Sequence, residues 1–380
     1  MTHIHRRYFA PLALGAAVLL AVSGCSGQVG GANAARSDGL LTIATYPVGS
    51  GTYNELAAVS DAMTSETDRS IRLIPADTGP GRVTMVMEGL TDLGRLGEEY
   101  WDAFEGANDF ATESWGPTEL NVVWHIPASL GIAVPEDSDI RVPADLEGVR
   151  VPYVVANPSV NNKMDAALAL GGLTRDDVEE VTIGGYSEVP EALRAGRVDV
   201  IPFNSTASAM RELDAQFGFR WLDLEAADAP ATEATGEIAP TVTIEEVMNA
   251  AGMTDGASAD ALTYGIPIVA RPDQDADFVH QYIVELVGTF DTYADSLTGM
   301  GSHKIENVAH EPSVVPFHPG LVRFLEENDL WTAEAEQKNE ELNSRADSLR
   351  AEWKKYIDQT PQDDVNDVTW TRWKEARVDD

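Results

Sequence analysis

The sequence contains a single cysteine and few basic residues. One cysteine among 380 residues cannot form a disulfide within the chain, and no CxxC pair that could hold a metal ion is present. Only 26 Lys and Arg residues stand against 63 Asp and Glu residues, so the formal net charge is −37. This charge repels phosphate backbones and anionic lipid headgroups, and it therefore argues against a nucleic-acid partner.

Long apolar runs are also missing, apart from one near the start. Phe9 to Val22 is almost entirely apolar, follows Arg6 and Arg7, and is too short for a comfortable membrane span. It ends in Val22-Ser23-Gly24-Cys25, which predicts a lipoprotein signal peptide over residues 1–24 with Cys25 as the lipidated first residue. An ordinary signal peptide with a chance cysteine is the alternative. Either cleavage implies an extracytoplasmic protein, and the first implies one anchored to the membrane by lipid.

Cleavage there would remove two basic and no acidic residues, giving a net charge of about −39 (24 − 63). Residues 25–39 are rich in Gly, Ala and Ser and predict a flexible tether. Since no later run could cross a bilayer, another chain would have to supply the pore if this protein takes part in transport.

Strand and helix patterns alternate after the tether. Leu40 to Ala44 and Ile71 to Ile74 predict strands, while Tyr53 to Met63 and Arg82 to Glu88 predict helices. Such alternation is typical of a mainly parallel sheet. Two segments, Met87–Gly94 and Arg194–Ile201, each leave a helix at a glycine and enter a strand through an aspartate. Gly89 and Gly196 suit left-handed helix caps, so the repeat suggests two domains of similar build.

The second half continues the pattern. Here we expect a polar loop to Asn162 and then helices over Lys163–Leu170, Ala207–Gln216 and Ala276–Tyr293. A further helix should be capped by Ser187 and have Pro190 in its first turn. Ile266–Ala270 predicts a strand, and Leu224–Glu237 predicts a surface excursion. The last fifty residues are charged and helical, with Trp331, Trp353, Trp370 and Trp373 as packing anchors. We expect one lobe from residues 40–138 with 265–380 and another from residues 139–264.

The loop Pro47–Tyr53 joins a strand to a helix through two glycines, as anion-binding loops do. A dinucleotide fingerprint would need a third glycine near Asn54, and a phosphate-binding loop would need a lysine after Gly51, so a nucleotide is excluded. The N–H groups of the helix start and the hydroxyls of Ser50 and Thr52 suit a carboxylate. The alternative is a tight turn in which Thr52 is a plain N-cap.

Arg82 follows a second such loop, which begins at Thr78. A guanidinium in the first turn of a helix is disfavoured by the helix dipole, and pairing with a carboxylate ligand would explain it. The alternative is a surface arginine paired with Glu88 or another acid. The candidate ligand-binding residues are Tyr46, Gly49, Ser50, Gly51, Thr52, Tyr53, Thr78, Arg82, His125, Ser159, Asn161, Asn162, Phe203, Asn204 and Ser205. Each of them also fits plain loop or core packing.

Catalytic patterns are absent from the sequence. It has no Gly-x-Ser-x-Gly elbow with a placed histidine and no His-Glu-x-x-His pair, so we expect no enzyme, no metal and no cofactor. Seven histidines are scattered, and His318 is expected to cap or pack against the last helix of the folded body.

Four stretches together resemble one transporter family. They are Pro47–Tyr53, Thr78-Gly79 with Glu88–Gly94, Asp145–Val151 and Val315–Leu321. In order and spacing the chain resembles the TAXI-type extracytoplasmic solute-binding proteins of TRAP transporters. The resemblance implies a type II periplasmic-binding-protein-like α/β fold with two lobes, a hinge and a ligand cleft between them. It also implies a monomer that delivers a small carboxylate, such as glutamate or 2-oxoglutarate, to TRAP membrane subunits.

The chain departs from this family at two loops that would face the ligand. Gly81-Arg82 stands where a Gly-Ser run normally leads to an asparagine, and Ala156–Asn162 replaces a glycine-rich Ser-Gly-Thr loop. The resemblance therefore does not identify the ligand. A substrate-binding lipoprotein of an ABC-type importer and a sensory or interaction lipoprotein are the alternative functions.

Overall fold

The structure is a computed structural model of the whole chain. It describes residues 39–378, except 49, 156, 225–234, 237, 249, 255–256 and 298. The predicted signal peptide, Cys25, nearly all of the tether, Gly49 and most of the predicted surface excursion therefore lie outside the described residues. Within the described part, no helix is both long and apolar enough to span a bilayer.

The first sheet contains five strands in the order β2-β1-β3-β12-β4. Their bounds are β1 Leu40–Thr45, β2 Ser70–Pro75, β3 Leu93–Arg95, β4 Asn121–Trp124 and β12 Ile268–Ala270. β1 runs parallel to β2 and β3, whereas β12 is antiparallel to both of its neighbours. Helices α1 (Gly51–Glu66), α2 (Gly79–Met87), α3 (Glu99–Glu105), α8 (Ala276–Gly288) and α9 (Phe290–Tyr293) belong to the same part of the molecule. Together they enclose the first hydrophobic core.

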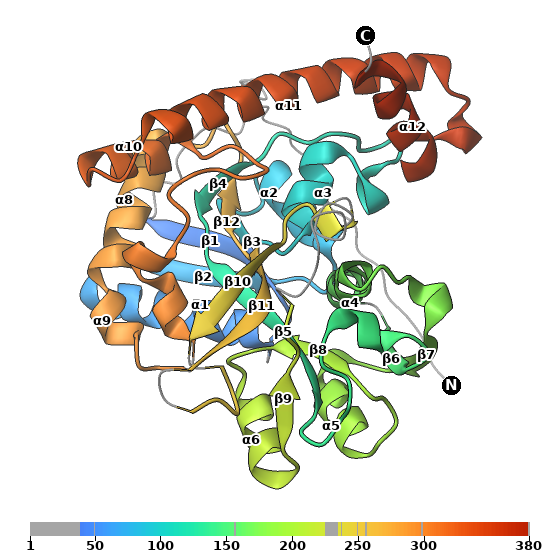
Figure 1. Cartoon of the computed structure of the whole chain (residues 1–380). Coiled ribbons are helices and arrows are strands. Elements are labelled where there is room, and N and C mark those ends of the chain that lie inside the picture. Colours follow the sequence, from blue (N-terminus) through green and yellow to red (C-terminus); the bar gives the residue numbers. More distant parts are fainter. Residues whose placement is uncertain are drawn as a thin grey trace, which may run out of the picture. The chain divides into compact units, whose positions relative to one another are not determined.

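A second core is built on two further sheets. One has the order β10-β11-β5-β8 with β9 also on β5, and every pairing in it is antiparallel. Its strands are β5 Pro127–Pro135, β8 Ile201–Asn204, β9 Phe219–Trp221, β10 Thr243–Met248 and β11 Ser258–Gly265. The other sheet pairs β6 (Arg150–Val154) in parallel with β7 (Glu179–Ile183). Helices α4 (Pro158–Leu170), α5 (Val189–Arg194) and α6 (Ser208–Gln216) complete this core (Figure 1).

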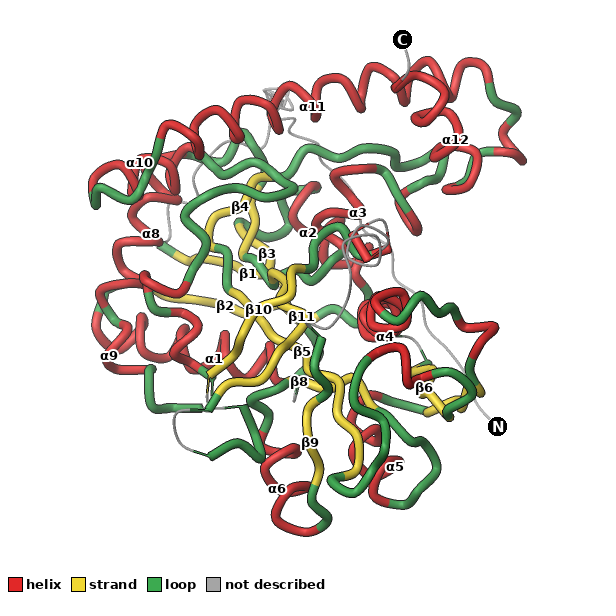
Figure 2. The backbone as a smooth tube through the Cα atoms, in the orientation of Figure 1, coloured by secondary structure: helices red, strands yellow, loops and turns green. Residues whose placement is uncertain are grey.

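Two connections between strands link the cores. β4 leads into β5 and β11 leads into β12, and Ile266 N–H donates to Ile126 O (2.9 Å) where these connections run side by side. Figure 2 shows the strands at the centre with helices around them. The prediction of a two-lobed α/β fold is confirmed, but the prediction of a mainly parallel sheet is wrong, because the linking strands pair as antiparallel neighbours. The lobe boundaries stay a prediction; Leu130 to Val134, which precede residue 139, pack in the second core.

The predicted internal repeat is present in three dimensions. Gly89 (φ 67°) and Gly196 (φ 64°) both take left-handed conformations after a helix. After the first, Asp92 accepts a hydrogen bond from Thr42 N–H (2.8 Å); after the second, Asp199 accepts one from Arg150 N–H (2.8 Å). Each aspartate therefore satisfies a backbone donor at the start of a strand, which explains why both turns carry it.

Some predicted boundaries differ from the structure. α4 begins at Pro158 and not at Lys163, because Asn157 caps it by accepting from Val160 N–H. Ser187 is not a cap: it lies inside a 3₁₀ turn over Tyr186–Glu188, and α5 starts without a side-chain cap. The long predicted helix from Ala276 is interrupted at Thr289 and continues as α9. At α4 the cap at Asn157 sets the helix start, whereas the other two ends differ without a side-chain cap.

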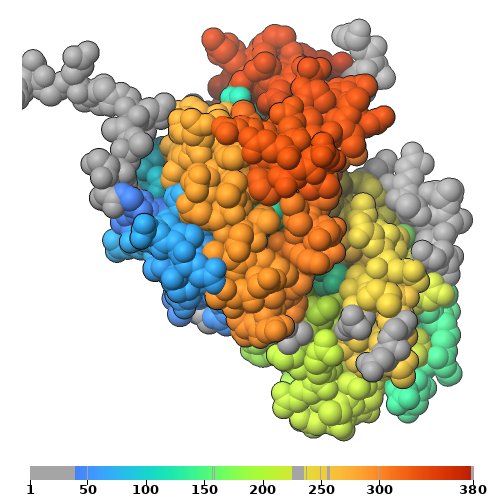
Figure 3. All heavy atoms as spheres, turned by 90° about the vertical axis from the view of Figure 1, so that its left-hand side faces the viewer, coloured from blue at the N-terminus to red at the C-terminus, as the bar shows by residue number. Residues whose placement is uncertain are grey.

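The C-terminal helices pack on the first core. α10 spans Pro319–Glu327, α11 spans Ala333–Gln359, and α12 spans Asp367–Val378 beside α3 (Figure 1). Trp353 and Trp370 are buried, and Trp331 and Trp373 pack against the same core, which confirms their role as anchors. On another side of the first core, the segment around α1 lies against α8 and α9 (Figure 3). Arg69 pairs with Glu285 at this contact.

His318 caps α10, as expected. Its Nδ1 accepts from Gly320 N–H (3.1 Å) and its Nε2 lies 3.1 Å from Gln274 O, so the neutral ring with a proton on Nε2 satisfies both neighbours. The ring is fully buried, and burial lowers the pKa of His318 to about 4. A second proton on Nδ1 would face the Gly320 N–H.

We therefore expect acid to destabilise the protein through His318. The His318 ring is protonated near pH 6.5 in the unfolded chain but only at about pH 4 in the folded protein. The stability that this difference contributes is therefore fully present above pH 6.5 and is lost as the pH falls towards 4. The loss between pH 7 and 4.5 is about 2–3 kcal/mol for this one group. Urea unfolding of the unaltered protein and of His318→Asn at both pH values measures this loss. His318→Asn keeps a capping acceptor, so it should show a smaller difference in the free energy of unfolding between the two pH values. An unchanged difference would contradict the assignment.

Candidate functional site

The opening loop ends in a capped helix, as the glycine pattern predicts. Ser50, and not Thr52, is the N-cap of α1, and its Oγ accepts from Tyr53 N–H (3.2 Å). Gly51 and Thr52 are the first two residues of the helix. Their N–H groups therefore lie at the positive end of the α1 dipole, where an anion is stabilised.

Arg82 is buried and fully engaged with other residues. Its Nε donates to Glu99 (3.0 Å), its Nη2 donates to the same oxygen, and its Nη1 donates to Ala76 O (3.1 Å). Its guanidinium also stacks on the Tyr46 ring at 3.8 Å. Thr78 caps the same helix by accepting from Gly81 N–H. The interpretation of Arg82 as a paired arginine is thus the one seen here, with Glu99 as the partner in place of Glu88.

Tyr46 is held by a close backbone approach. A Cβ atom on Gly97 would overlap the Tyr46 hydroxyl, so a larger residue there would displace the Tyr46 ring. Burial and the nearby carboxylate of Glu99 raise the pKa of Tyr46 above its usual range, and the hydroxyl stays protonated at neutral pH. Tyr46 therefore offers a neutral polar edge beside Arg82.

Lys163 joins the two cores. It lies on α4 and has no exposed surface, and its Nζ approaches Glu98, just before α3, at 2.9 Å. Ser159 Oγ accepts from the same Nζ (2.9 Å), and the ring of Tyr264 lies 3.7 Å away. Thr241 donates to Glu98 (3.1 Å). Burial lowers the pKa of Lys163, and the charge of Glu98 opposes that shift.

The remaining candidate residues of the second core make hydrogen bonds and packing contacts within the protein. Asn161 is in α4 and not in a loop; its side chain accepts from Val154 N–H and donates to Val154 O, so its hydrogen bonds close an internal contact. Asn162 also lies in the helix, half buried. Phe203 stacks on Tyr186 with centroids 4.4 Å apart. Asn204 Oδ1 accepts from Thr206, and Ser205 is buried against Ser129. The predicted loop placement of Ser159, Asn161 and Asn162 is therefore wrong.

His125 lies at the link between the cores. A Cβ on Gly265 would overlap its ring, and its Nδ1 is buried without a hydrogen-bond partner among the described residues. Burial, with the charge of Arg95 adding to it, lowers the pKa of His125 to about 4. The ring is neutral at pH 7 and fills the corner where β4 turns into β5.

Sequence reasoning did not single out Arg95, Glu98 or Lys163 as site residues. Arg95 ends β3, is 1% exposed, and lies 3.3 Å from Glu55 on α1. Among the described residues, the buried lysines and arginines are Arg82, Arg95 and Lys163. The available signal was scarcity: in so acidic a chain, a basic residue directly after an apolar strand or inside an apolar helix face needs a reason.

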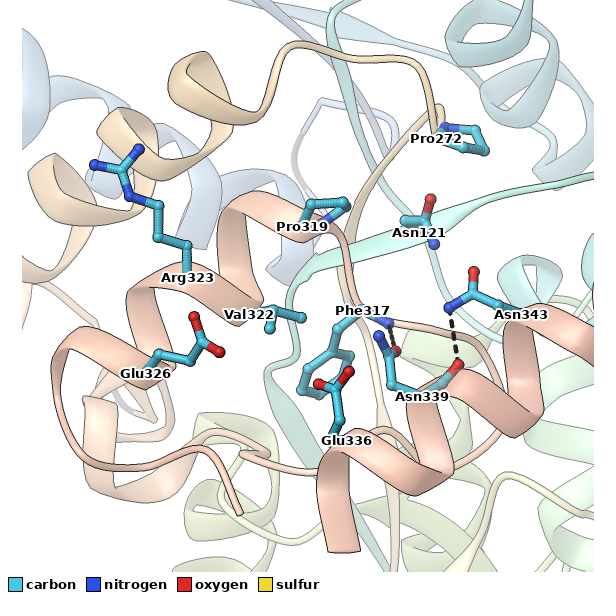
Figure 4. A pocket seen from close by; sticks show the side chains of 10 residues that line it. All are labelled: Asn121, Pro272, Phe317, Pro319, Val322, Arg323, Glu326, Glu336, Asn339 and Asn343. Atoms are coloured by element: carbon cyan, nitrogen blue, oxygen red, sulfur yellow. Dashed lines mark hydrogen bonds between the residues drawn. The ribbon is translucent and has the colours of Figure 1, made fainter. Parts of the chain in front are cut away.

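Pockets occur elsewhere as well. One of about 430 Å³ lies between α10 and α11, and none of the predicted site residues lines it. In Figure 4, Asn339 accepts from Phe317 N–H (2.7 Å) at its edge. A second, of about 170 Å³, is lined by His303 and by residues of α8 and α9. In the part of the chain that the structure describes, no group of three or more His, Cys, Asp or Glu side chains could hold a metal ion.

Comparison with known proteins identifies the family. The model of the NMT1-like family matches residues 43–328, which includes every candidate residue named above. The chain belongs to the NMT1-like family. No curated protein matches it.

Solved structures similar to this NMT1-like chain are distant. The periplasmic aliphatic sulphonate binding protein SsuA from Escherichia coli shares 16% identity, with 80% of this chain and 92% of that chain covered and a TM-score of 0.42. A TctC solute binding protein from Polaromonas shares 12% identity, with 82% and 96% covered and a TM-score of 0.46. SsuA from Xanthomonas axonopodis pv. citri, bound to MOPS, shares 18% identity, with 81% and 97% covered and a TM-score of 0.41. At these scores the likenesses carry no argument about the ligand.

Proposed function

We propose that the protein is an extracytoplasmic solute-binding protein that captures a small organic anion and is not an enzyme. The ligand would be a carboxylate such as glutamate or 2-oxoglutarate, delivered to a TRAP-type membrane transporter, as the TAXI resemblance suggests. Cys25 would carry the lipid that holds the protein at the outer face of the membrane. Membership of the NMT1-like family and the two-lobed fold support a binding role.

One observation carries this proposal. The three buried basic side chains of the described residues lie on α2, β3 and α4, although the chain has more than twice as many acidic as basic residues. Burying a cation is unfavourable unless an anion compensates it. Arg82 and Lys163 are closely paired with Glu99 and Glu98, whereas Glu55, the partner of Arg95, lies 3.3 Å away and is partly exposed. The region therefore favours a negatively charged ligand.

A thermal-shift screen tests the function. We expect the melting temperature to rise with one or more dicarboxylates, oxo-acids or acidic amino acids, because a ligand that binds only the folded state stabilises it by about 2.7 kcal/mol at 100 times its Kd. Neutral amides of the same compounds are the matched control and should give no shift. The absence of a shift with every carboxylate would refute the proposal, and a shift with sulfonates alone would replace carboxylates by another anion class.

A further inference from the structure

Arg95 differs from the two other buried cations in what remains unsatisfied. Its Nε and Nη1 are buried and have no hydrogen-bond partner among the described residues. Among the described residues, the acceptor that Arg95 contacts is Glu55, whose oxygen lies 3.3 Å from Nη2, a long contact for a charge-assisted hydrogen bond. Arg95 is 1% exposed, so two buried donor nitrogens without acceptors destabilise the folded state. Buried donors of this kind are usually satisfied by a ligand, an ion or a water molecule.

Arg82 shows within the same molecule what a filled guanidinium looks like. Its Nε and Nη2 both donate to one oxygen of Glu99, and its Nη1 donates to Ala76 O, so each guanidinium nitrogen has an acceptor. At Arg95 the equivalent pair of nitrogens has Nε empty and Nη2 loosely held. A carboxylate, which accepts from two adjacent guanidinium nitrogens, matches this pair.

Further buried polar atoms without hydrogen-bond partners belong to residues that neighbour Arg95 in the sheet, share its partner Glu55 or interact with its charge. Thr45 follows Ala44, which pairs with Gly94 across β1 and β3, so Thr45 lies beside Arg95 in the sheet register. The Thr45 hydroxyl, the Tyr282 hydroxyl and both ring nitrogens of His303 are buried without hydrogen-bond partners in the described structure. The charge of Arg95 acts on both Tyr282 and His303. His303 Nε2 also approaches the same Glu55 oxygen as Arg95, at 3.8 Å.

These atoms suit an anion. Burial lowers the pKa of His303, so its ring is neutral at pH 7 and can donate one hydrogen bond. The hydroxyls of Thr45 and Tyr282 can donate as well. Within the part of the chain that the structure describes, Glu55 is the acid that pairs with Arg95, and its side chain is 32% exposed, so it can turn towards solvent and leave the guanidinium.

We propose that Arg95 is the residue that binds the carboxylate of the ligand, that Thr45, Tyr282 and His303 complete the site, and that Glu55 occupies Arg95 until the ligand replaces it. This inference rests on the proposed capture of a carboxylate. It transfers the role predicted for Arg82 to Arg95, because all three guanidinium nitrogens of Arg82 already have acceptors.

The test is isothermal titration with the carboxylate that gives the largest thermal shift. Arg95→Lys keeps the positive charge but lacks the adjacent donors of the planar guanidinium. We expect the Kd to rise by about 10- to 100-fold, the size expected for a lost hydrogen bond to a charged group. Arg345→Lys is the matched control, because Arg345 pairs side-on with Glu105 in the C-terminal part and has no place in the proposed site, so it should change the Kd by less than about 3-fold. Equal losses at both positions would overturn the assignment.

Glu55→Gln separates a binding role from a structural one. If Glu55 competes with the ligand for Arg95, its neutral isostere should lower the Kd several-fold, whereas a purely structural pair would give weaker or unchanged binding. Because Glu55 is partly exposed, this variant should fold even if changes at Arg95 do not. Unchanged or weaker binding by Glu55→Gln would refute the competition. No binding of any carboxylate by the unaltered protein would instead refute the proposed function.

Discussion

Glu98→Gln is expected to lower the free energy of unfolding by about 3–5 kcal/mol, because it leaves Lys163 buried without its counter-charge. Lys163 has no exposed surface, so water cannot replace the lost carboxylate. Its other partners, Ser159 and the ring of Tyr264, are uncharged and compensate only part of the loss. Urea unfolding at pH 7 measures the change.

Two controls make the Glu98 result specific. The double variant Glu98→Gln with Lys163→Met removes both charges and should recover a large part of the lost stability, since a neutral pair carries no desolvation penalty. Arg194→Gln breaks an exposed pair with Glu191 and should cost at most about 1 kcal/mol. If Glu98→Gln costs no more than Arg194→Gln, the pair does not hold the two cores together.

Trp370→Ala should destabilise the protein by about 3–5 kcal/mol, the cost of removing a large aromatic side chain from a core. Trp370 has no exposed surface, its ring packs edge-on against Trp353 with centroids 4.9 Å apart, and its Nε1 donates to Glu105 O (2.9 Å). The substitution opens a cavity and leaves that carbonyl without its donor. Urea unfolding, with limited proteolysis of α12 alongside, measures the effect.

Trp373→Ala is the matched control in the same helix. Trp373 is half buried and contacts Tyr356 and Arg377 near the surface, so its loss should cost clearly less than that of Trp370. Equal effects at the two positions would mean that α12 detaches as a unit. If neither change alters the stability, α11 and α12 do not brace the first core.

The local features of the fold could be predicted with success. Gly89 and Gly196, the aspartates that follow them, and the cap at His318 all depend on interactions within a few residues or on one repeated turn, so the sequence pattern contains the necessary information. The antiparallel linking strands could not be predicted in the same way. Their apolar pattern is compatible with either direction, and only the path of the chain between the two cores selects one.

The site shows the same division more sharply. Ser50, Thr78 and Tyr46 were identified because a glycine loop followed by a helix has a local signature. Arg95 and Lys163 were missed because each takes its meaning from partners at least forty residues away in the sequence, Glu55 and Glu98. Single-sequence patterns contain no record of such pairs.

By itself, the sequence determined the excess of negative charge, the alternation of strands and helices, the cap at His318 and the tryptophan anchors, and it predicts the export signal. Periodicity, capping and composition are properties of short segments, which is why they can be read directly. Only the tertiary structure decided that Arg82 pairs with Glu99, that Lys163 spans the two cores, and that Arg95 keeps unsatisfied donors in the interior. Burial and ion pairing depend on which distant segments become neighbours, and the packing of the whole chain sets those neighbours.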